Sequence, residues 1–122
     1  MNVLAKAALA AAALLYCTVD ALAHAHLRTQ DPTAGAAVSV SPAALLFGFS
    51  EGLEIGLSSV TVKGADGHAI DTGAAALAPG DDKQMSVPLK GQLAAGTYTV
   101  DWHVLSKDGH TTNGTYQFTV GP

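Results

Sequence analysis

The sequence contains very little sulfur. Its only cysteine is Cys17, and its two methionines are Met1 and Met85. Cys17 lies in an N-terminal segment that we expect to be removed on export, so the mature chain would have neither an internal disulfide nor a thiolate ligand for a metal. A lipoprotein signal cleaved just before Cys17 is an alternative, although the preceding Tyr16 is bulky where such signals carry a small residue. The remaining small domain must be stable without covalent cross-links.

Basic residues and long apolar runs are also scarce. The chain has 6 Lys and Arg residues, which are scattered, and a net charge of −4, a composition that argues against nucleic-acid binding. The apolar run at residues 7–15 is far shorter than the roughly 20 residues that a membrane-spanning helix needs. We therefore expect neither a nucleic-acid partner nor a retained transmembrane anchor.

The start of the chain has the organisation of a secretory signal peptide. Lys6 precedes the apolar run, and Ala21-Leu22-Ala23 supplies the small residues of a cleavage site. We therefore predict a signal peptide over residues 1–23 and one domain over residues 24–122, because no linker or repeat divides the rest of the chain.

Histidine comes first in the mature chain under either plausible cleavage. Cleavage after Ala23 leaves His24 at the N-terminus, whereas cleavage after Ala25 leaves His26. In both cases an imidazole and a free α-amine belong to the same residue.

The mature sequence is typical of an all-β domain. Residues 97–105 alternate strictly, and one face carries Tyr98, Val100, Trp102 and Val104. Residues 115–120 repeat the pattern, and shorter alternations predict strands at residues 45–49, 60–62 and 85–89. Since no segment has a helical period, we predict a small Greek-key β-barrel or sandwich of the immunoglobulin-like or cupredoxin-like kind.

Two details of this β prediction concern proline and alanine. Pro88 interrupts the strand at residues 85–89, which suggests that this strand lies at a sheet edge. Residues 72–79, "TGAAALAP", have low complexity and are interpreted as a loop.

Asp108 and His110 lie two positions apart, between two predicted strands. In extended backbone such residues face the same side, which would bring a carboxylate and an imidazole together. The signal is weak alone, because Asp-Gly between strands usually marks only a turn. The same letters occur at residues 66–68, where we expect only a hairpin.

The mature N-terminus strengthens the metal hypothesis. His24 would offer its α-amine, whose ordinary pKa of about 7.7–8.0 lets a metal displace the proton near neutral pH, and its imidazole. Together with Asp108 and His110, this gives three nitrogens and one oxygen, a donor set that favours Cu(II), whereas Zn(II) prefers a tetrahedral arrangement. We predict one Cu(II) per chain on these three residues.

The other histidines have different interpretations. The run His24-Ala25-His26 also has the form of an amino-terminal copper motif, in which the amine, two deprotonated amides and the third imidazole surround the metal. This alternative would leave the Asp-x-His pair unused, and His26 would otherwise be a surface group or a neighbour of the metal ligands. We expect His103 on the solvent face of its strand and His68 in a turn. Trp102 is interpreted as a core aromatic that can report metal binding.

At three places the sequence resembles CopC, the periplasmic copper-resistance protein C family. The matches are "HAHLRTQDPTAGA" at 24–36, "LLFGFSEGLE" at 45–54 and "GTYTVDWHVLSKDGHTTNGTYQFTV" at 96–120. The resemblance implies a Greek-key β-barrel that binds copper in the bacterial periplasm. It also implies a Cu(II) site on His24, Asp108 and His110, with Leu27 aligned so that His24 is the terminal ligand.

Sulfur content separates this chain from some members of that family. The resemblance implies that some members also carry a Cu(I) site, built from several methionines and a histidine, because thioethers suit the softer ion. Met85 alone cannot make such a site, so we expect Cu(II) binding only. The resemblance further implies handover to a membrane partner such as a CopD-like transporter, and we expect a monomer.

These residues are compatible with three alternative functions. The first is a periplasmic Cu(II)-binding protein for copper resistance or homeostasis, which is not an enzyme. The second is an oxidative copper enzyme, since polysaccharide monooxygenases also use an N-terminal histidine chelate. However, those are larger, and the Asp108 carboxylate would oppose copper reduction. The third is a metal-free β-sandwich that binds a partner, in which the histidines are incidental.

Overall fold

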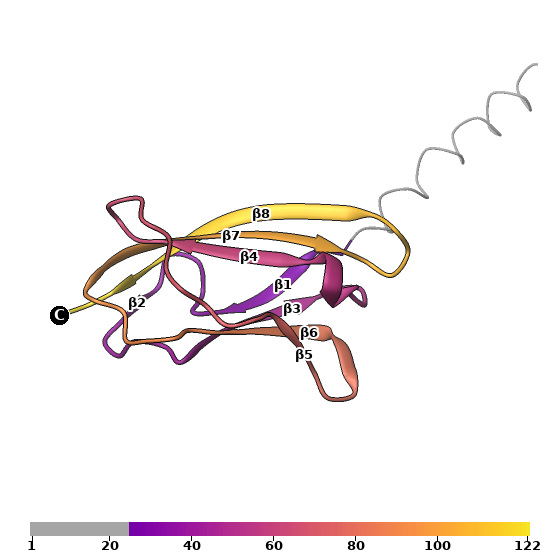
Figure 1. Cartoon of the computed structure of the whole chain (residues 1–122), viewed down its shortest axis with the longest axis horizontal. Coiled ribbons are helices and arrows are strands. Elements are labelled where there is room, and N and C mark those ends of the chain that lie inside the picture. Colours follow the sequence, from indigo (N-terminus) through magenta and orange to yellow (C-terminus); the bar gives the residue numbers. More distant parts are fainter. Residues whose placement is uncertain (1–24) are drawn as a thin grey trace, which may run out of the picture.

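The computed structural model describes residues 25–122 and is a sandwich of two four-stranded β-sheets (Figure 1). One sheet has the strand order β1-β3-β6-β5 and the other β2-β8-β7-β4. The strands are β1 (Leu27–Asp31), β2 (Ala37–Val38), β3 (Ala44–Phe49), β4 (Ser59–Lys63), β5 (Ala76–Ala78), β6 (Asp81–Pro88), β7 (Gly96–Leu105) and β8 (Thr111–Val120). A short 3-10 helix, η3 (Ile55–Leu57), precedes β4. The prediction of a small all-β domain is confirmed.

Alternating side chains form the core between the two sheets. The predicted inward faces of β7 and β8 are confirmed, because Trp102, Tyr116 and Phe118 are among the residues buried there. Aromatic rings bridge the sheets, with Phe49 of β3 edge-on to Trp102 of β7 at a centroid distance of 5.3 Å. The buried core consists of Ala25, Leu45, Phe47, Phe49, Leu53, Val62, Met85, Val87, Tyr98, Val100, Trp102, Val104, Tyr116, Phe118 and Val120.

Two details predicted around β6 are wrong. β6 is not an edge strand, because it pairs with β3 on one side and β5 on the other. Pro88 is its last residue, where the missing N–H interrupts no ladder. β5 lies within residues 72–79, which were expected to be a loop. Alanine has little intrinsic strand preference, so pairing with β6 rather than local sequence makes this segment a strand.

Some strands have no clear signal in the sequence. β1 and β2 were not predicted, and β8 begins at Thr111 rather than Thr115. The first residues of β8 are polar or glycine, so they show no apolar alternation. They become a strand because they continue the ladder to β7 as far as the pair Leu105–Thr111.

The sheet register places two hairpin loops at opposite ends of the sandwich. β4 runs antiparallel to β7, with Ser59 opposite His103 and Lys63 opposite Thr99. The loop that follows β4 therefore lies at the far end from the β7–β8 loop, as Figure 1 shows. η3 and the start of β1 lie at the same end as the β7–β8 loop.

The predicted signal peptide and the predicted ligand His24 lie outside the described residues. Across residues 25–122, no helix has the length and apolar character to span a membrane.

Tyr116 provides a test of this core. Its hydroxyl is buried and makes no hydrogen bond within residues 25–122, and burial, followed by the negative charge of Asp31, raises its pKa to about 12. Tyr116→Phe keeps the ring beside Phe47 and removes the unsatisfied group. We therefore expect the free energy of unfolding to rise by about 1 kcal/mol at pH 7.

The pH dependence of stability gives this prediction a second measurement. Because folding raises the Tyr116 pKa above its unfolded value of about 10, the parent protein should lose stability between about pH 10 and 12, and the variant should lose less. Tyr98→Phe is a matched control, since the Tyr98 hydroxyl donates to the Ala94 carbonyl at 2.6 Å and its loss should destabilise. Urea denaturation at pH 7 and 11 measures both effects. Lower stability of Tyr116→Phe at both pH values would contradict the prediction.

Candidate metal centre

Asp108 and His110 lie on the tight loop that joins β7 to β8, residues 106–110. The Ser106 amide donates to the His110 carbonyl at 2.9 Å, and the Gly109 amide donates to the Ser106 carbonyl at 2.9 Å. Gly109 has a φ of 92°, a left-handed conformation open to glycine, as expected for a type I turn that ends in a bulge. The expected proximity of Asp108 and His110 is therefore found, but a turn produces it rather than extended backbone.

The two side chains face each other at the surface. Asp108 Oδ1 lies 3.3 Å from His110 Nδ1 and accepts the His110 backbone N–H at 3.2 Å. The same oxygen accepts the Ser106 hydroxyl, and this bond is the main cause that holds the pKa of Asp108 below its usual value. The exposed fractions are 50% for His110 and 39% for Asp108. An ionised carboxylate and an imidazole thus lie together at the surface.

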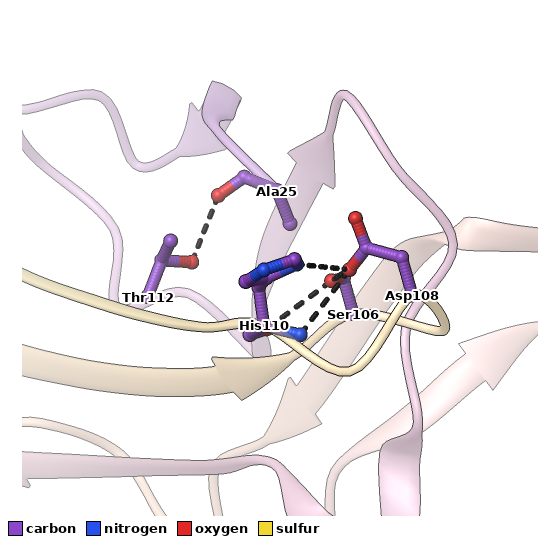
Figure 2. A network of polar contacts seen from close by, with 5 residues as sticks. All are labelled: Ala25, Ser106, Asp108, His110 and Thr112. Carbon is purple, nitrogen blue, oxygen red and sulfur yellow. Dashed lines mark hydrogen bonds and ion pairs between the residues drawn. The ribbon is translucent and has the colours of Figure 1, made fainter. Parts of the chain in front are cut away.

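The first described residues lie beside this pair. Ala25 is fully buried, and its carbonyl accepts the Thr112 hydroxyl at 2.8 Å. Thr112 follows His110 by two residues, and Figure 2 shows the His110 ring between the Ala25–Thr112 bond and Asp108. Ser50, at the end of β3, fixes the next residue from the other side, since its hydroxyl accepts the His26 amide at 2.8 Å. The chain at residues 25 and 26 is therefore held by both sheets.

A bridging segment, residues 52–54, joins the loop to the opposite sheet. Gly52 accepts the Lys107 amide at 2.9 Å, and Leu53 donates to the Asp82 carbonyl of β6 at 2.9 Å. Lys107 Nζ lies 2.8 Å from Asp82 Oδ2, and this contact lowers the pKa of Asp82. A Cβ at Gly52 would lie 2.6 Å from that same carboxylate oxygen, so a larger residue there would have to displace the Asp82 side chain. Sequence reasoning missed this segment, whose only signal is "EGLE" before η3.

The loop at residues 64–68 has the same backbone design at the far end of the sandwich. Gly64 donates to the His68 carbonyl at 3.0 Å, Gly67 donates to the Gly64 carbonyl at 3.0 Å, and Gly67 has a φ of 83°. Asp66 accepts the His68 amide at 3.0 Å and lies 2.8 Å from His68 Nδ1. The hairpin expected there is confirmed. The two Asp-Gly-His loops thus differ in surroundings rather than in fold.

The remaining candidate residues are separate from the loop. His103 is exposed on β7, as expected, and Met85 is buried in the core. Within residues 25–122 no group of three or more potential His, Cys, Asp or Glu ligands exists. Asp108 and His110 are therefore a pair, and a complete metal site would need a donor from outside the described residues.

The amino-terminal motif His24-Ala25-His26 fits these contacts poorly. Binding in that mode requires the amide nitrogens of Ala25 and His26 to lose their protons and face the metal. The His26 amide proton is already donated to the Ser50 hydroxyl, and Ala25 is buried with its carbonyl bonded to Thr112. The motif would have to break the His26–Ser50 hydrogen bond and bring the metal to the buried Ala25.

Comparisons with known proteins agree with one another. The family model described as "CopC domain" matches residues 27–121. Protein YobA of Escherichia coli K12 is 48% identical over 103 residues, 84% of this chain and 83% of that protein. Copper resistance protein C of Escherichia coli is 36% identical over 126 residues, 98% of this chain and 99% of that protein.

A solved structure gives the same answer for the fold. The crystal structure of CopC from Methylosinus trichosporium OB3b superposes with a TM-score of 0.76 at 32% identity, and the match covers 81% of this chain and 95% of that one. Sequence and structure therefore agree along the whole sandwich, and the chain belongs to the CopC family.

Proposed function

We propose that the mature protein is a periplasmic Cu(II)-binding protein that sequesters or hands over one copper ion per chain. In this proposal His24 supplies its α-amine and imidazole, His110 an imidazole, and Asp108 a carboxylate oxygen. The observation that carries it is the Ala25–Thr112 hydrogen bond. A ligand at residue 24 would be one peptide bond from a residue already fixed beside the pair.

The available donors suit copper as cargo. Neutral imidazole and a carboxylate are ligands that Cu(II) accepts readily, and tetragonal nitrogen and oxygen sets favour it over other divalent ions. Copper handling is common to the family. The choice of Cu(II) is supported by the donor types and by the position of Met85, whose thioether lies in the core.

In this proposal the protein has no catalytic activity and passes its copper ion to a partner. An anionic ligand stabilises Cu(II) relative to Cu(I), which opposes the redox cycling that an oxidase needs. Delivery to a CopD-like membrane transporter by a monomer agrees with the family resemblance. Signal-peptide cleavage after Ala23 and release into the periplasm are part of the same proposal, because only cleavage exposes the His24 amine.

A copper titration tests the function directly. Protein beginning at His24 is titrated with Cu(II) against a competing chelator, and the fluorescence of Trp102, the only tryptophan, is followed. Trp102 is opposite Gly114 in the ladder, one inward position from Thr112, so copper at the loop should quench it. We expect a sharp endpoint at about one equivalent.

Two results would oppose the proposal. Weak quenching without an endpoint would favour the metal-free interaction module. Sustained peroxide production from the copper-loaded protein with ascorbate would favour the oxidative enzyme.

A further inference from the structure

We propose that Ser106 is the positioning residue of the 106–110 loop. Its buried hydroxyl holds Asp108 Oδ1 within the protein and thereby turns Oδ2 toward the metal. This inference rests on the proposed Cu(II) function and adds a residue that does not itself bind the ion.

Burial distinguishes Ser106 from the other polar side chains. It is 1% exposed, and within residues 25–122 no other serine, threonine, asparagine, glutamine, histidine or charged residue is buried. A buried hydroxyl needs a partner, because an unsatisfied one costs about 1–3 kcal/mol. The partners of the Ser106 hydroxyl are Asp108 Oδ1 and the His110 carbonyl, which belong to the two proposed metal ligands.

The single hydroxyl proton goes to the carboxylate. The Ser106 oxygen is within reach of Asp108 Oδ1 and lies 3.1 Å from the His110 carbonyl. That carbonyl already accepts the Ser106 amide, and a hydrogen bond to an ionised acceptor is the stronger one. Oδ1 thus receives the Ser106 hydroxyl and the His110 amide on the protein side.

The second oxygen of Asp108 is left available. Within residues 25–122, Oδ2 makes no hydrogen bond, and Figure 2 shows it pointing away from the contacts around Oδ1. The carboxylate can therefore offer Oδ2 to an ion without giving up the bonds that orient it.

The 64–68 loop shows what the same turn does without this serine. Gly64 occupies the position of Ser106, and a Cβ there would lie 3.2 Å from Asp66 Oδ1. Without a hydroxyl, Asp66 uses both oxygens on its own histidine, Oδ1 for the His68 amide and Oδ2 for the His68 ring at 2.8 Å. In the 64–68 loop, which lacks the serine, both carboxylate oxygens therefore bind the histidine, whereas in the 106–110 loop, which has it, Asp108 Oδ2 makes no hydrogen bond within residues 25–122.

Ser106→Ala tests the proposal against a matched control, Ser58→Ala. The Ser58 hydroxyl accepts the Leu105 amide at 3.2 Å and donates to the Glu54 carbonyl at 2.9 Å. It lies at the same end of β7 but contacts neither Asp108 nor His110. We expect Ser106→Ala to weaken Cu(II) affinity by about 10–100-fold, as loss of an outer partner typically does, and to change the Cu(II) hyperfine splitting in electron paramagnetic resonance. Ser58→Ala should change affinity less than about 3-fold and leave the spectrum unchanged, whatever its effect on thermal stability.

A conservative variant and a metal-free measurement complete the experiment. Ser106→Thr retains the hydroxyl and should restore most of the affinity and the parent spectrum. In the metal-free protein, amide resonances that shift in Ser106→Ala should concentrate at residues 106–110. Parent-like affinity and spectrum in Ser106→Ala, or an equal loss in Ser58→Ala, would overturn the positioning role while leaving the proposed function intact. Absence of Cu(II) binding by the parent protein would overturn both.

Discussion

Adding one alanine before His24 is expected to weaken Cu(II) binding by about 100-fold or more, equivalent to about 2.7 kcal/mol. The extension converts the α-amine into an amide, whose nitrogen binds a metal only after losing a weakly acidic proton. It leaves Asp108 and His110 untouched, and it adds nothing to the core, so the thermal stability of the metal-free protein should not change. Competition with a chelator for the extended and unextended proteins measures the difference. Equal affinities would exclude the terminal chelate.

His26→Ala separates the two versions of an N-terminal site. In the amino-terminal motif the His26 imidazole is a ligand, and its removal would abolish binding. In the proposed site it is exposed, and only its backbone contacts Ser50. We therefore expect the Cu(II) affinity of His26→Ala to stay within about 3-fold of the parent value, a change of less than about 0.7 kcal/mol. This variant is the control for the extension, since both alter the N-terminal segment.

His110→Ala is expected to reduce Cu(II) affinity by about 100–1,000-fold, or about 3–4 kcal/mol. The change removes a nitrogen donor from a pair that no other described His, Cys, Asp or Glu can complete. Asp108→Asn should act in the same direction, because it removes the charge of the carboxylate while keeping its shape. Each variant is titrated with Cu(II) under the conditions used for the parent protein.

His68→Ala is the matched control within the same molecule. His68 has the same place in a hairpin loop of the same backbone design, with the same neighbouring aspartate and glycine. It lies at the far end of the sandwich from the chain start. Its replacement should leave the affinity within about 2-fold. Comparable losses in His68→Ala and His110→Ala would mean that copper binds exposed histidines nonspecifically, and the single-site proposal would fail.

The sequence predicted the strands whose apolar and polar residues alternate and the turn that holds Asp108 and His110. The alternation from Tyr98 to Val104 identified β7 and its buried face, and the same period identified most of β8. The Asp108–His110 pair was found because both residues belong to one short turn. In each case the deciding contacts are local, so a window of a few residues contains the signal.

Contacts between distant segments were not predicted. The bridging segment at 52–54 connects Lys107 to Asp82 of the other sheet, and nothing periodic marks any of the three partners. Ser106 precedes a turn, where serine is usually exposed, so its burial could not be inferred from its neighbours. β5 is a strand only because β6 pairs with it. These features depend on how the two sheets meet, which a single sequence does not display.

The Ala25–Thr112 bond also sets the order of events when the protein is made. It joins residues 87 positions apart, so Ala25 cannot make this contact until the last strand has been formed, although β1 can already pair with β3. Such long-range contacts form late, because the chain must first give up the entropy of closing a large loop. Under the proposed export and copper-binding function, a chain still emerging through the membrane could not complete the site, and copper loading would follow folding. Copper that binds only the finished domain would then lower the rate at which folded molecules are lost to unfolding and proteolysis.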